Sequence, residues 1–269
     1  MTSTGPAGDG STESSTDPRL PPVIWMMPER PARGPKPAHS RDEIAAAAIK
    51  IADGEGLDAV TMRRVAAEIG CGTMTLYRYV PTKDGLFDLM IDATAGEEEL
   101  VVRLPGTARR SGPDWRAGLR AIAQAGRATL LRHPWLVSLQ SGRPSFGPNG
   151  LRNLELGFGM IDHLDLDVDQ MMIMLNTVVS FVRGAVVAEL AEQEAQRRTG
   201  LDQQQWQRRM APYVRKLMDS GQYPMFNRII AEAKLPHSEG GADEQFSLQL
   251  DRVLDGLAAD LPAEPEPGD

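Results

Sequence analysis

Cysteine, long apolar runs and an N-terminal leader pattern are scarce or missing in this sequence. The 269 residues contain one cysteine, Cys71, which excludes an intramolecular disulfide framework and a zinc finger and fits a reducing cytosol. The first ten residues, MTSTGPAGDG, have neither the basic nor the apolar region of a secretory signal. Asn176 and Arg183 interrupt the most apolar stretch, residues 171–190, so we expect a buried or interface helix there rather than a membrane span.

Basic charge and catalytic groupings are scarce as well. The chain carries 29 Lys and Arg residues against 37 Asp and Glu residues, a net charge of −8 at pH 7. This balance excludes a protein coated in basic surface for non-specific nucleic-acid binding, so any DNA contact must come from a local positive patch. We find no paired catalytic carboxylates, no Ser-His-Asp set and no phosphate-binding loop, and therefore expect neither an enzyme nor a bound cofactor or metal.

Residues 61–83, TMRRVAAEIGCGTMTLYRYVPTK, are typical of two short helices joined by a tight turn. Thr61 is a good N-cap for the first helix, and Gly70 supplies the left-handed residue that ends it. Thr73 is the expected N-cap of the second helix, and Pro81 blocks its continuation. Two short helices around a small glycine-containing turn form a helix-turn-helix, whose second helix enters the major groove of DNA.

The outward side of the second short helix carries groups that suit DNA contact. Hydroxyls, aromatic rings and a guanidinium can reach base edges and phosphates, while Leu76 and Val80 give the helix a buried side. Lys83, at the start of the following helix, is placed to favour phosphate. The expected DNA-contacting residues of the second helix are Thr73, Met74, Thr75, Tyr77, Arg78 and Tyr79.

At these residues the chain resembles the TetR family of bacterial repressors. The resemblance covers residues 40–95, about a fifth of the chain, and rests on the pattern T-x-R-x-V-A-x-x-I-G-x-x-x-x-T-L-Y-x-Y-V-x-x-K. Arg63 matches a position that contacts DNA in that family. Arg64 is its neighbour, and we expect one of the two to be only a surface charge. The resemblance implies a cytoplasmic, nucleoid-associated bacterial protein that binds double-stranded DNA as a homodimer.

Composition divides the chain into four segments. Residues 1–37, rich in Ser, Thr, Gly and Pro, and residues 262–269 are expected to be disordered tails. Residues 38–97 are the expected helix-turn-helix domain, opened by a capping box of Ser40 and Glu43. Residues 98–261 are the expected helical regulatory and dimerisation domain.

Two features of the first tail leave alternatives open. The apolar residues 23–27 either dock on the folded body or form an exposed linear segment. Arg30, Arg33 and Lys36 form a basic arm that either reaches an adjacent minor groove or is a solvated linker.

The fold class predicted is all-α, because no stretch alternates with period two for long enough to make a strand. A fourth helix is expected at residues 82–102. The helices expected after this fourth one are residues 113–131, 151–163, 167–198, 202–219, 223–233 and 243–261. Asp167 is the expected N-cap of the longest of them.

The second half resembles, more weakly, the regulatory domain of the tetracycline repressor, through Trp115, the run His133-Pro134-Trp135, the pair Arg143-Pro144 and the helix that carries Gly184. This resemblance implies a ligand cavity in each body. It also implies a dimer formed by a four-helix bundle of the longest helix and the last one. We expect no membrane partner.

The metal and drug ligands of the tetracycline repressor are not matched. Its histidine positions fall near Glu99 and at Ser138 or Leu139, none of which supplies an imidazole, so a magnesium-tetracycline ligand is not expected. An apolar cavity would take its place, although each candidate residue also fits an ordinary core. The candidate lining residues are Trp115, Trp135, Phe158, Met160, Met171, Met174 and Phe181.

These observations lead us to expect a homodimeric transcriptional regulator, specifically a repressor released from a palindromic operator by a small apolar effector. The alternative is an effector-independent dimeric DNA-binding protein with no ligand cavity. A cavity in the body separates the two hypotheses.

Overall fold

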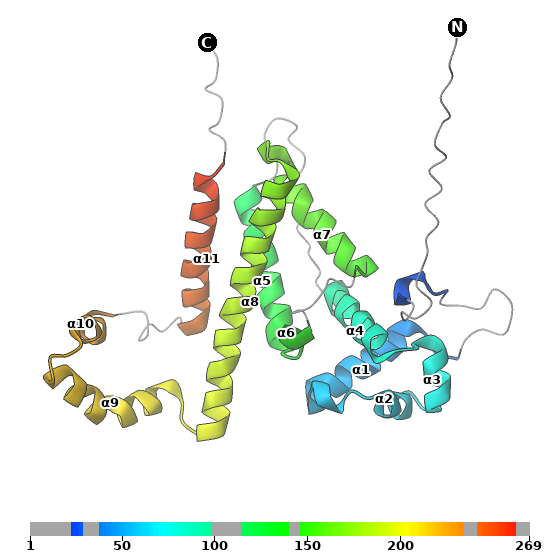
Figure 1. Ribbon diagram of the computed structural model, residues 1–269, viewed down its shortest axis with the longest axis horizontal. Coiled ribbons are helices and arrows are strands. Elements are labelled where there is room, and N and C mark those ends of the chain that lie inside the picture. The colour runs from blue at the N-terminus through cyan, green and yellow to red at the C-terminus, as the bar shows by residue number, and fades with distance from the viewer. Residues whose placement is uncertain (1–22, 29–37, 98–113, 140–145, 234–240, 262–269) are drawn as a thin grey trace, which may run out of the picture.

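The computed structural model describes residues 23–28, 38–97, 114–139, 146–233 and 241–261, and all regular structure within these ranges is helical. The prediction of an all-α chain with an N-terminal helix-turn-helix domain and a larger helical body is therefore confirmed (Figure 1). The helices of the N-terminal domain, called the head below, are η1 (Ile24–Met26), α1 (Arg41–Glu55), η2 (Leu57–Ala59), α2 (Met62–Glu68), α3 (Thr73–Tyr79) and α4 (Lys83–Glu97).

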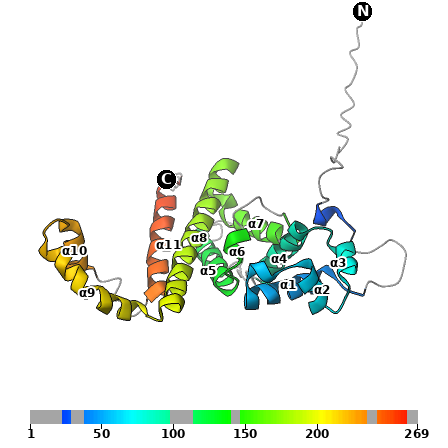
Figure 2. The same cartoon turned by 60° about the horizontal axis from the view of Figure 1, so that its bottom comes forward.

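The remaining helices form a body and a projecting arm. In Figure 1 the arm, α9 and α10, extends from the lower end of α8, away from the head, and Figure 2 shows the same projection from another side. The body and arm helices are α5 (Trp115–Arg132), α6 (Leu136–Leu139), α7 (Pro148–Ile161), η3 (Asp162–Leu164), α8 (Val168–Thr199), α9 (Gln203–Asp219), α10 (Pro224–Glu232) and α11 (Gly241–Ala259).

Side-chain caps fix where several of these helices begin. Ser40 and Glu43 form the predicted capping box, in which each backbone amide donates to the other side chain at 3.1 Å. The Thr61 hydroxyl accepts from the Arg64 amide, as predicted. Asp167 caps α8 and forms a capping box with Gln170.

Three predicted helix starts need correction. Helix α5 begins at Trp115, with Asp114 as its N-cap, rather than at residue 113. Thr73 is not an N-cap: Gly72 occupies that position in extended backbone, and its carbonyl accepts from the amides of Thr75 and Leu76, so Thr73 is the first residue of α3. Helix α7 begins at Pro148 rather than at Leu151, because proline is favoured in the first turn, where its missing amide costs nothing. Residues 98–102, predicted to extend α4, lie outside the described residues.

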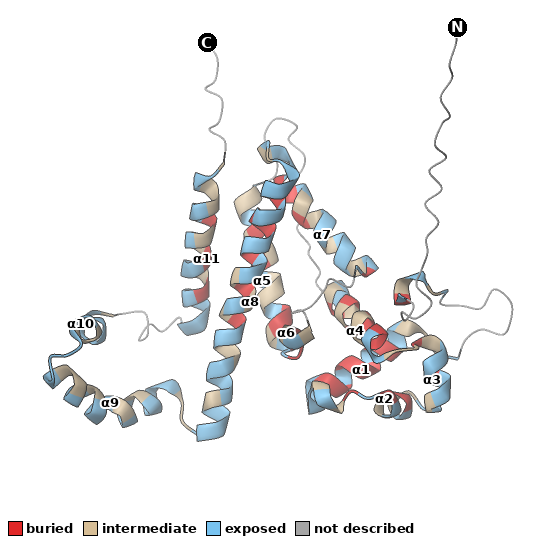
Figure 3. Ribbon diagram, viewed as in Figure 1, coloured by how far each residue is buried: buried red, intermediate tan, exposed pale blue. Residues whose placement is uncertain are grey.

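The core is continuous from head to body (Figure 3). In the head, the apolar face of α1 packs against the buried side of the helix-turn-helix and against α4; Leu76, Val80, Leu86 and Met90 are fully buried. In the body, α5 packs on α7 and α8, and α11 packs on α8. By length and composition alone α8 could cross a membrane, but a third of its apolar window is already buried inside the body by this packing.

Arg127 joins three helices of the body. Its guanidinium lies 2.8 Å from the Glu189 carboxylate of α8, 2.7 Å from the Asp243 carboxylate of α11 and 4.9 Å from the centre of the Phe246 ring. Burial acts to lower the pKa of Arg127, but the hydrogen bonds to Asp243 and Glu189 outweigh it and raise the pKa. The charge on α5 therefore stays paired, which holds α11 against the α5–α8 pair.

The apolar segment at residues 23–27 docks on the head, which decides between the two alternatives for it. Ile24 is 2% exposed and packs toward α4, next to Gly85. The Arg41 guanidinium donates to the Ile24 and Met27 carbonyls at 3.0 and 3.1 Å. The prediction of a disordered tail is therefore wrong for residues 23–28; Arg30, Arg33 and Lys36 lie outside the described residues, as do residues 262–269.

Ile24→Ala should lower the free energy of unfolding by about 2–3 kcal/mol, because it removes a buried side chain and leaves a cavity under α4. Met26→Ala is the matched control: Met26 is 73% exposed in the same turn, and its loss should change stability by less than about 0.5 kcal/mol. Urea unfolding followed by far-ultraviolet circular dichroism measures both. Equal effects of the two substitutions would contradict the docking of this segment.

Candidate nucleic-acid interface and body pocket

The turn between α2 and α3 is held by backbone hydrogen bonds. Gly70 has φ +72°, the left-handed conformation predicted for it. The Gly70 amide donates to the Ala67 carbonyl at 3.2 Å and the Cys71 amide donates to the Ala66 carbonyl at 2.9 Å, which is the Schellman arrangement of a helix end. Leu76 and Val80 then anchor α3 with no exposed surface. The angle between the two helices is thus set by local backbone geometry and by the core of the head.

This anchoring leaves the outer face of α3 in solvent. Met74 and Tyr77 are 78% and 42% exposed, and Thr75 and Arg78 are also exposed. Thr73 is half-buried. These five predicted residues therefore share one accessible helix of two turns, which suits entry into a groove about 12 Å wide.

Tyr79, Arg63 and Lys83 lie in different surroundings. Tyr79 is half-buried, and its ring meets His39 edge-on at 6.4 Å between centroids, so part of it serves packing. Arg63 and Lys83 are exposed, and the Lys83 ammonium lies 5.1 Å above the Phe87 ring. Tyr79 ends α3, Arg63 lies on α2 and Lys83 begins α4, and all three remain candidates for contacts with the DNA backbone.

The geometry distinguishes Arg63 from its neighbour. Arg64 donates to Glu68 at 2.8 Å and to Glu55 at 2.9 Å, and Lys50 pairs with the same Glu68 at 2.7 Å. The hydrogen bonds from Lys50 and Arg64 lower the pKa of Glu68. Their stabilising contribution is fully present above the pKa of an unfolded glutamate and is lost as the pH falls through the lowered value. Arg64 thus ties α1 to α2, which makes Arg63 the better candidate for DNA.

A polar cluster around His133 joins the head to the body. The ring Nδ1 lies 2.8 Å from Asp53 Oδ1 of α1, and Nε2 lies 3.0 Å from Glu97 Oε2 of α4. Trp135 Nε1 donates to the same Asp53 oxygen at 2.7 Å, and Arg132 donates to the same Glu97 oxygen at 3.2 Å. His133 is the C-cap of α5, and its role as a link between two domains was not visible in the sequence.

A second polar link, centred on Asp92, joins α4 to α7. Asp92 is 5% exposed, and its Oδ1 accepts from the amides of Asn149 and Gly150 at 2.9 Å each. The Asn149 side chain donates to the Asp92 carboxylate and carbonyl, and Asn153 donates to the Ala95 carbonyl of α4. Asp92 therefore binds the unpaired amides at the start of α7, where a negative charge is favoured.

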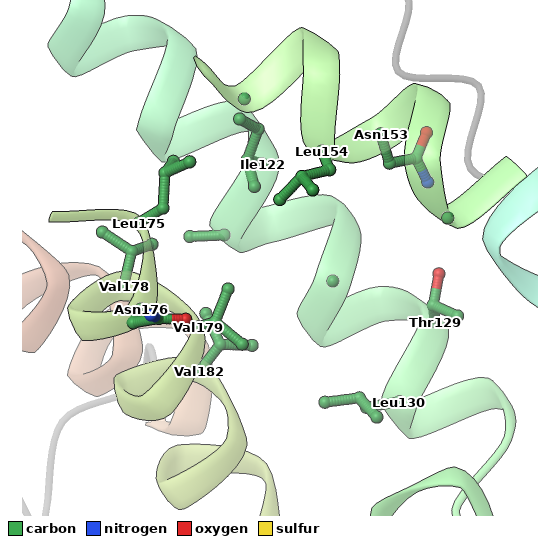
Figure 4. Close-up of a pocket in the computed structure, with 14 residues that line it drawn as sticks. Ile122, Thr129, Leu130, Asn153, Leu154, Leu175, Asn176, Val178, Val179 and Val182 are labelled. Atoms are coloured by element: carbon green, nitrogen blue, oxygen red, sulfur yellow. The ribbon is translucent and has the colours of Figure 1, made fainter. Parts of the chain in front are cut away.

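A pocket of about 270 Å³ lies between α5, α7 and α8. Figure 4 shows Ile122, Leu154 and Val182 turned toward it from these three helices. Its wall is mainly apolar, and among the described residues that line it none carries a charge. The lining residues are Ile122, Ala123, Gly126, Thr129, Leu130, Gly150, Asn153, Leu154, Gly157, Leu175, Asn176, Val178, Val179 and Val182.

The seven residues proposed from the sequence to line a cavity lie elsewhere. Trp135, Met160, Met171 and Met174 are buried in the core, and Trp115, Phe158 and Phe181 pack against it, with Phe181 5.3 Å from Phe246 between ring centroids. Nine of the 14 residues that line the pocket are instead valine, leucine or glycine. Large residues fill the space between helices, whereas glycines at 126, 150 and 157 leave it open, so size was the wrong signal to follow.

Nothing in the described residues resembles a metal centre. They contain no group of three His, Cys, Asp or Glu side chains that could hold an ion. Ser138 is exposed and Leu139 half-buried, and neither lines the pocket; Glu99 lies outside the described residues.

Comparison with known proteins gives matches for both halves of the chain. The family model for bacterial regulatory proteins of the tetR family matches residues 44–90. The model for the tetracyclin repressor-like C-terminal domain matches residues 109–261.

Individual relatives agree with these family models. The HTH-type transcriptional repressor DrrR1 of Streptomyces coeruleorubidus is 39% identical over 256 residues, covering 94% of this chain and 90% of DrrR1. An HTH-type transcriptional regulator of Saccharopolyspora erythraea is 36% identical over 186 residues, covering 66% of this chain and 72% of that protein. The structure of the Streptomyces coelicolor TetR family protein ActR in complex with actinorhodin superposes with a TM-score of 0.63 at 24% identity, covering 84% of this chain and 98% of ActR.

Asp92→Ala should lower the free energy of unfolding by about 2 kcal/mol, because it leaves the amides of Asn149 and Gly150 without their charged acceptor. Asp92→Asn keeps one acceptor oxygen and should cost less. Asp84→Ala, an exposed position on the same helix, serves as the control, and thermal unfolding compares the three variants. An Asp92→Ala protein as stable as the control would show that the α4–α7 link contributes nothing to stability.

Proposed function

This chain belongs to the TetR family of bacterial regulatory proteins, a family of DNA-binding transcription regulators, and we propose that it is a homodimeric repressor released from its operator by a small, uncharged, apolar effector. We also propose that it works in the cytoplasm, on double-stranded DNA.

The observation that carries the DNA-binding proposal is the contrast between the two sides of α3. Leu76 and Val80 are fully buried, while Thr75, Tyr77 and Arg78 are exposed, with no other described part of the chain covering them. Arg78 can form a bidentate contact with a guanine edge, and the threonine hydroxyls can reach bases or phosphates. Arg63 and Lys83 supply additional positive charge on a protein whose net charge is −8.

We assign dimerisation to α8 and α11. Ile173, Val179 and Val187 on α8 and Leu248 on α11 are 64%, 56%, 45% and 39% exposed in the single chain. Burying such residues against a second copy would produce a four-helix bundle. A two-fold dimer would then present two α3 helices to half-sites about 34–36 Å apart, which a near-palindromic operator provides.

The pocket suits an effector without charge. Its wall offers apolar side chains and a few polar groups from Thr129, Asn153 and Asn176, which can orient a ligand. Two of its lining residues, Gly150 and Asn153, donate hydrogen bonds to α4. A ligand that displaces α7 would therefore act on α4 through Asp92 and Ala95. The protein would then have two conformations, one with the heads placed to bind DNA and one with the heads displaced. The ligand would weaken DNA binding only if its affinity for the second conformation is higher than for the first.

The effector-independent alternative is less favoured because the body is not packed solid. A pocket of about 270 Å³ with an apolar wall is near the lower size limit of small-molecule sites. Thermal-shift screening of the purified protein with apolar compounds distinguishes the two proposals, since a body that binds none of them would support the alternative.

Arg78→Ala should weaken operator binding by about 1–3 kcal/mol and relax base preference at one position of each half-site. The operator is first selected from random duplexes, and affinity is then measured by fluorescence anisotropy at fixed salt. Arg198→Ala, at the far end of α8, is the control and should leave affinity unchanged. Wild-type affinity in both Arg78→Ala and Tyr77→Ala would refute α3 as the reading helix.

Gly126→Leu should block the pocket without harming the fold. A Cβ at Gly126 would lie 3.8 Å from Val182, so the added side chain points into free space, and leucine favours a helix over glycine. The variant should lose binding of an uncharged aromatic probe, N-phenyl-1-naphthylamine, and keep its operator affinity. Gly159→Leu places the same side chain on an exposed part of α7 and should bind the probe normally. Undiminished probe binding by Gly126→Leu would place the effector elsewhere.

A further inference from the structure

Helix α3 has few anchors of its own for a helix that is proposed to read DNA. Among its seven residues Leu76 alone is buried, and the α2–α3 turn holds only the beginning of the helix. Tyr77 and Arg78 lie toward the other end and are exposed. Base contacts need side chains held within about 0.5 Å of their working positions, and a helix fixed at one end can still pivot. The contacts at the far end of α3 therefore decide how precisely it is placed.

Residues 23–27, which we call the strap, pack at this far end of α3. Val80 is the C-cap of α3, and Gly85 lies in the first turn of α4. A Cβ placed on Gly85 would lie 3.7 Å from a side-chain carbon of Ile24 and equally far from one of Val80. Figures 1 and 2 both show η1, drawn in dark blue, beside α4. The buried side chain of Ile24 thus closes over the junction between α3 and α4.

Arg41, the first residue of α1, holds the strap in place. Its Nη1 donates to the carbonyls of Ile24 and Met27, at the beginning and the end of the η1 turn. Two residues before Arg41, the His39 ring meets the ring of Tyr79, the last residue of α3. The entry to α1 therefore contacts the end of α3 directly, through these two rings, and indirectly, through the strap.

We propose that the strap is a working part of the DNA-binding head, because it locks the end of α3 to the beginnings of α1 and α4 and so fixes the angle at which α3 meets the duplex. Arg41 is a positioning residue that acts through the strap. This inference rests on the DNA-binding role proposed for α3 and adds a determinant outside the helix-turn-helix. A head without a docked strap would keep its positive charges, and hence its attraction to phosphates, but would lose the fixed placement that base recognition requires.

Ile24→Ala and Arg41→Gln, each in the full chain, test the strap from its two sides. Each should weaken operator binding about tenfold or more, whereas affinity for a non-operator duplex should change less than about threefold, because charge governs non-specific binding. Met26→Ala, exposed in the same turn, should alter neither affinity by more than about twofold. Fluorescence anisotropy at fixed salt measures all three variants. Wild-type operator affinity in both Ile24→Ala and Arg41→Gln would overturn the proposal.

A second control separates the position of α3 from a general loss of stability. Leu119→Ala removes a fully buried side chain from α5, in the body, and should destabilise the protein about as much as Ile24→Ala does. At a temperature at which circular dichroism shows every variant folded, Leu119→Ala should keep operator affinity within about twofold of wild type. Equal losses of operator affinity in Leu119→Ala and Ile24→Ala would refute a positional role. Ile24→Val, which removes one methylene, replaces Ile24→Ala if that variant does not fold, and should show a smaller loss that is still confined to the operator.

Combining the two substitutions shows whether Arg41 acts through the strap. Ile24→Ala with Arg41→Gln should weaken operator binding no more than about twofold beyond the larger single effect, because both substitutions release the same segment. The slope of log affinity against log salt concentration should be the same for Arg41→Gln as for wild type. Single effects that multiply in the double variant, or a salt slope reduced by about one unit, would show that Arg41 binds a phosphate itself and would overturn its positioning role.

Failure of this inference is distinguishable from failure of the proposed function. A wild-type chain that selects an operator, together with strap variants that bind the same operator equally well, would refute the role of the strap and leave the DNA-binding function intact. A wild-type chain that selects no duplex at all would instead refute the proposed function itself.

Discussion

Helix α4 belongs to both halves of the molecule, and the position of the head depends on how it is held. Leu86 and Met90, near its beginning and middle, are fully buried in the head core. Asp92 and Glu97, further along, are bonded to α7 and to the His133 cluster of the body. A rigid helix pinned at both ends transmits a displacement of either end to the other, because packed cores do not deform continuously. The polar links at its body end are therefore as important to the geometry as the apolar core at its head end.

These polar links differ in kind from the packing around them. Apolar contacts allow small sliding movements at low cost, whereas a buried carboxylate that loses its donors is strongly penalised. The Asp92 carboxylate accepts hydrogen bonds from backbone amides, and the His133 ring contacts the Asp53 carboxylate. Both contacts are specific in distance and direction. They favour a small number of discrete arrangements of the head over a continuum, which is the property that a two-state regulator needs.

Local signals in the sequence predicted much of the fold. Caps at Ser40, Thr61 and Asp167, the left-handed Gly70 and the buried pair Leu76 and Val80 all depend on neighbours within a few residues, and each was predicted correctly. Thr73 was misassigned because Gly72 offers a competing cap, and both fit the local pattern. The outward face of α3 followed from the same short-range periodicity; its contact with DNA remains a prediction.

The pocket and the interdomain links could not be predicted in the same way. Gly126 and Gly157 line the pocket only because three helices from distant parts of the sequence meet there. Asp53 and Trp135 are separated by 82 positions, and no periodicity connects them. Met160 and Met174 were proposed as lining residues because they are large and apolar, but both are buried in the core and do not line the pocket. Which helix faces meet is a property of the whole packing arrangement.

The brevity of α2 and α3 has a final consequence for how this protein evolves and can be engineered. Each has seven residues, far below the length of about 12–15 at which an isolated helix becomes marginally stable in water. A synthetic peptide of residues 61–83 would be a fluctuating coil, so the surface proposed to read DNA depends on the head core for its shape. Substitutions on α3 within the folded head can therefore change its preference for DNA sequence. Helices α2 and α3 transferred to another protein without the head core would not keep their structure.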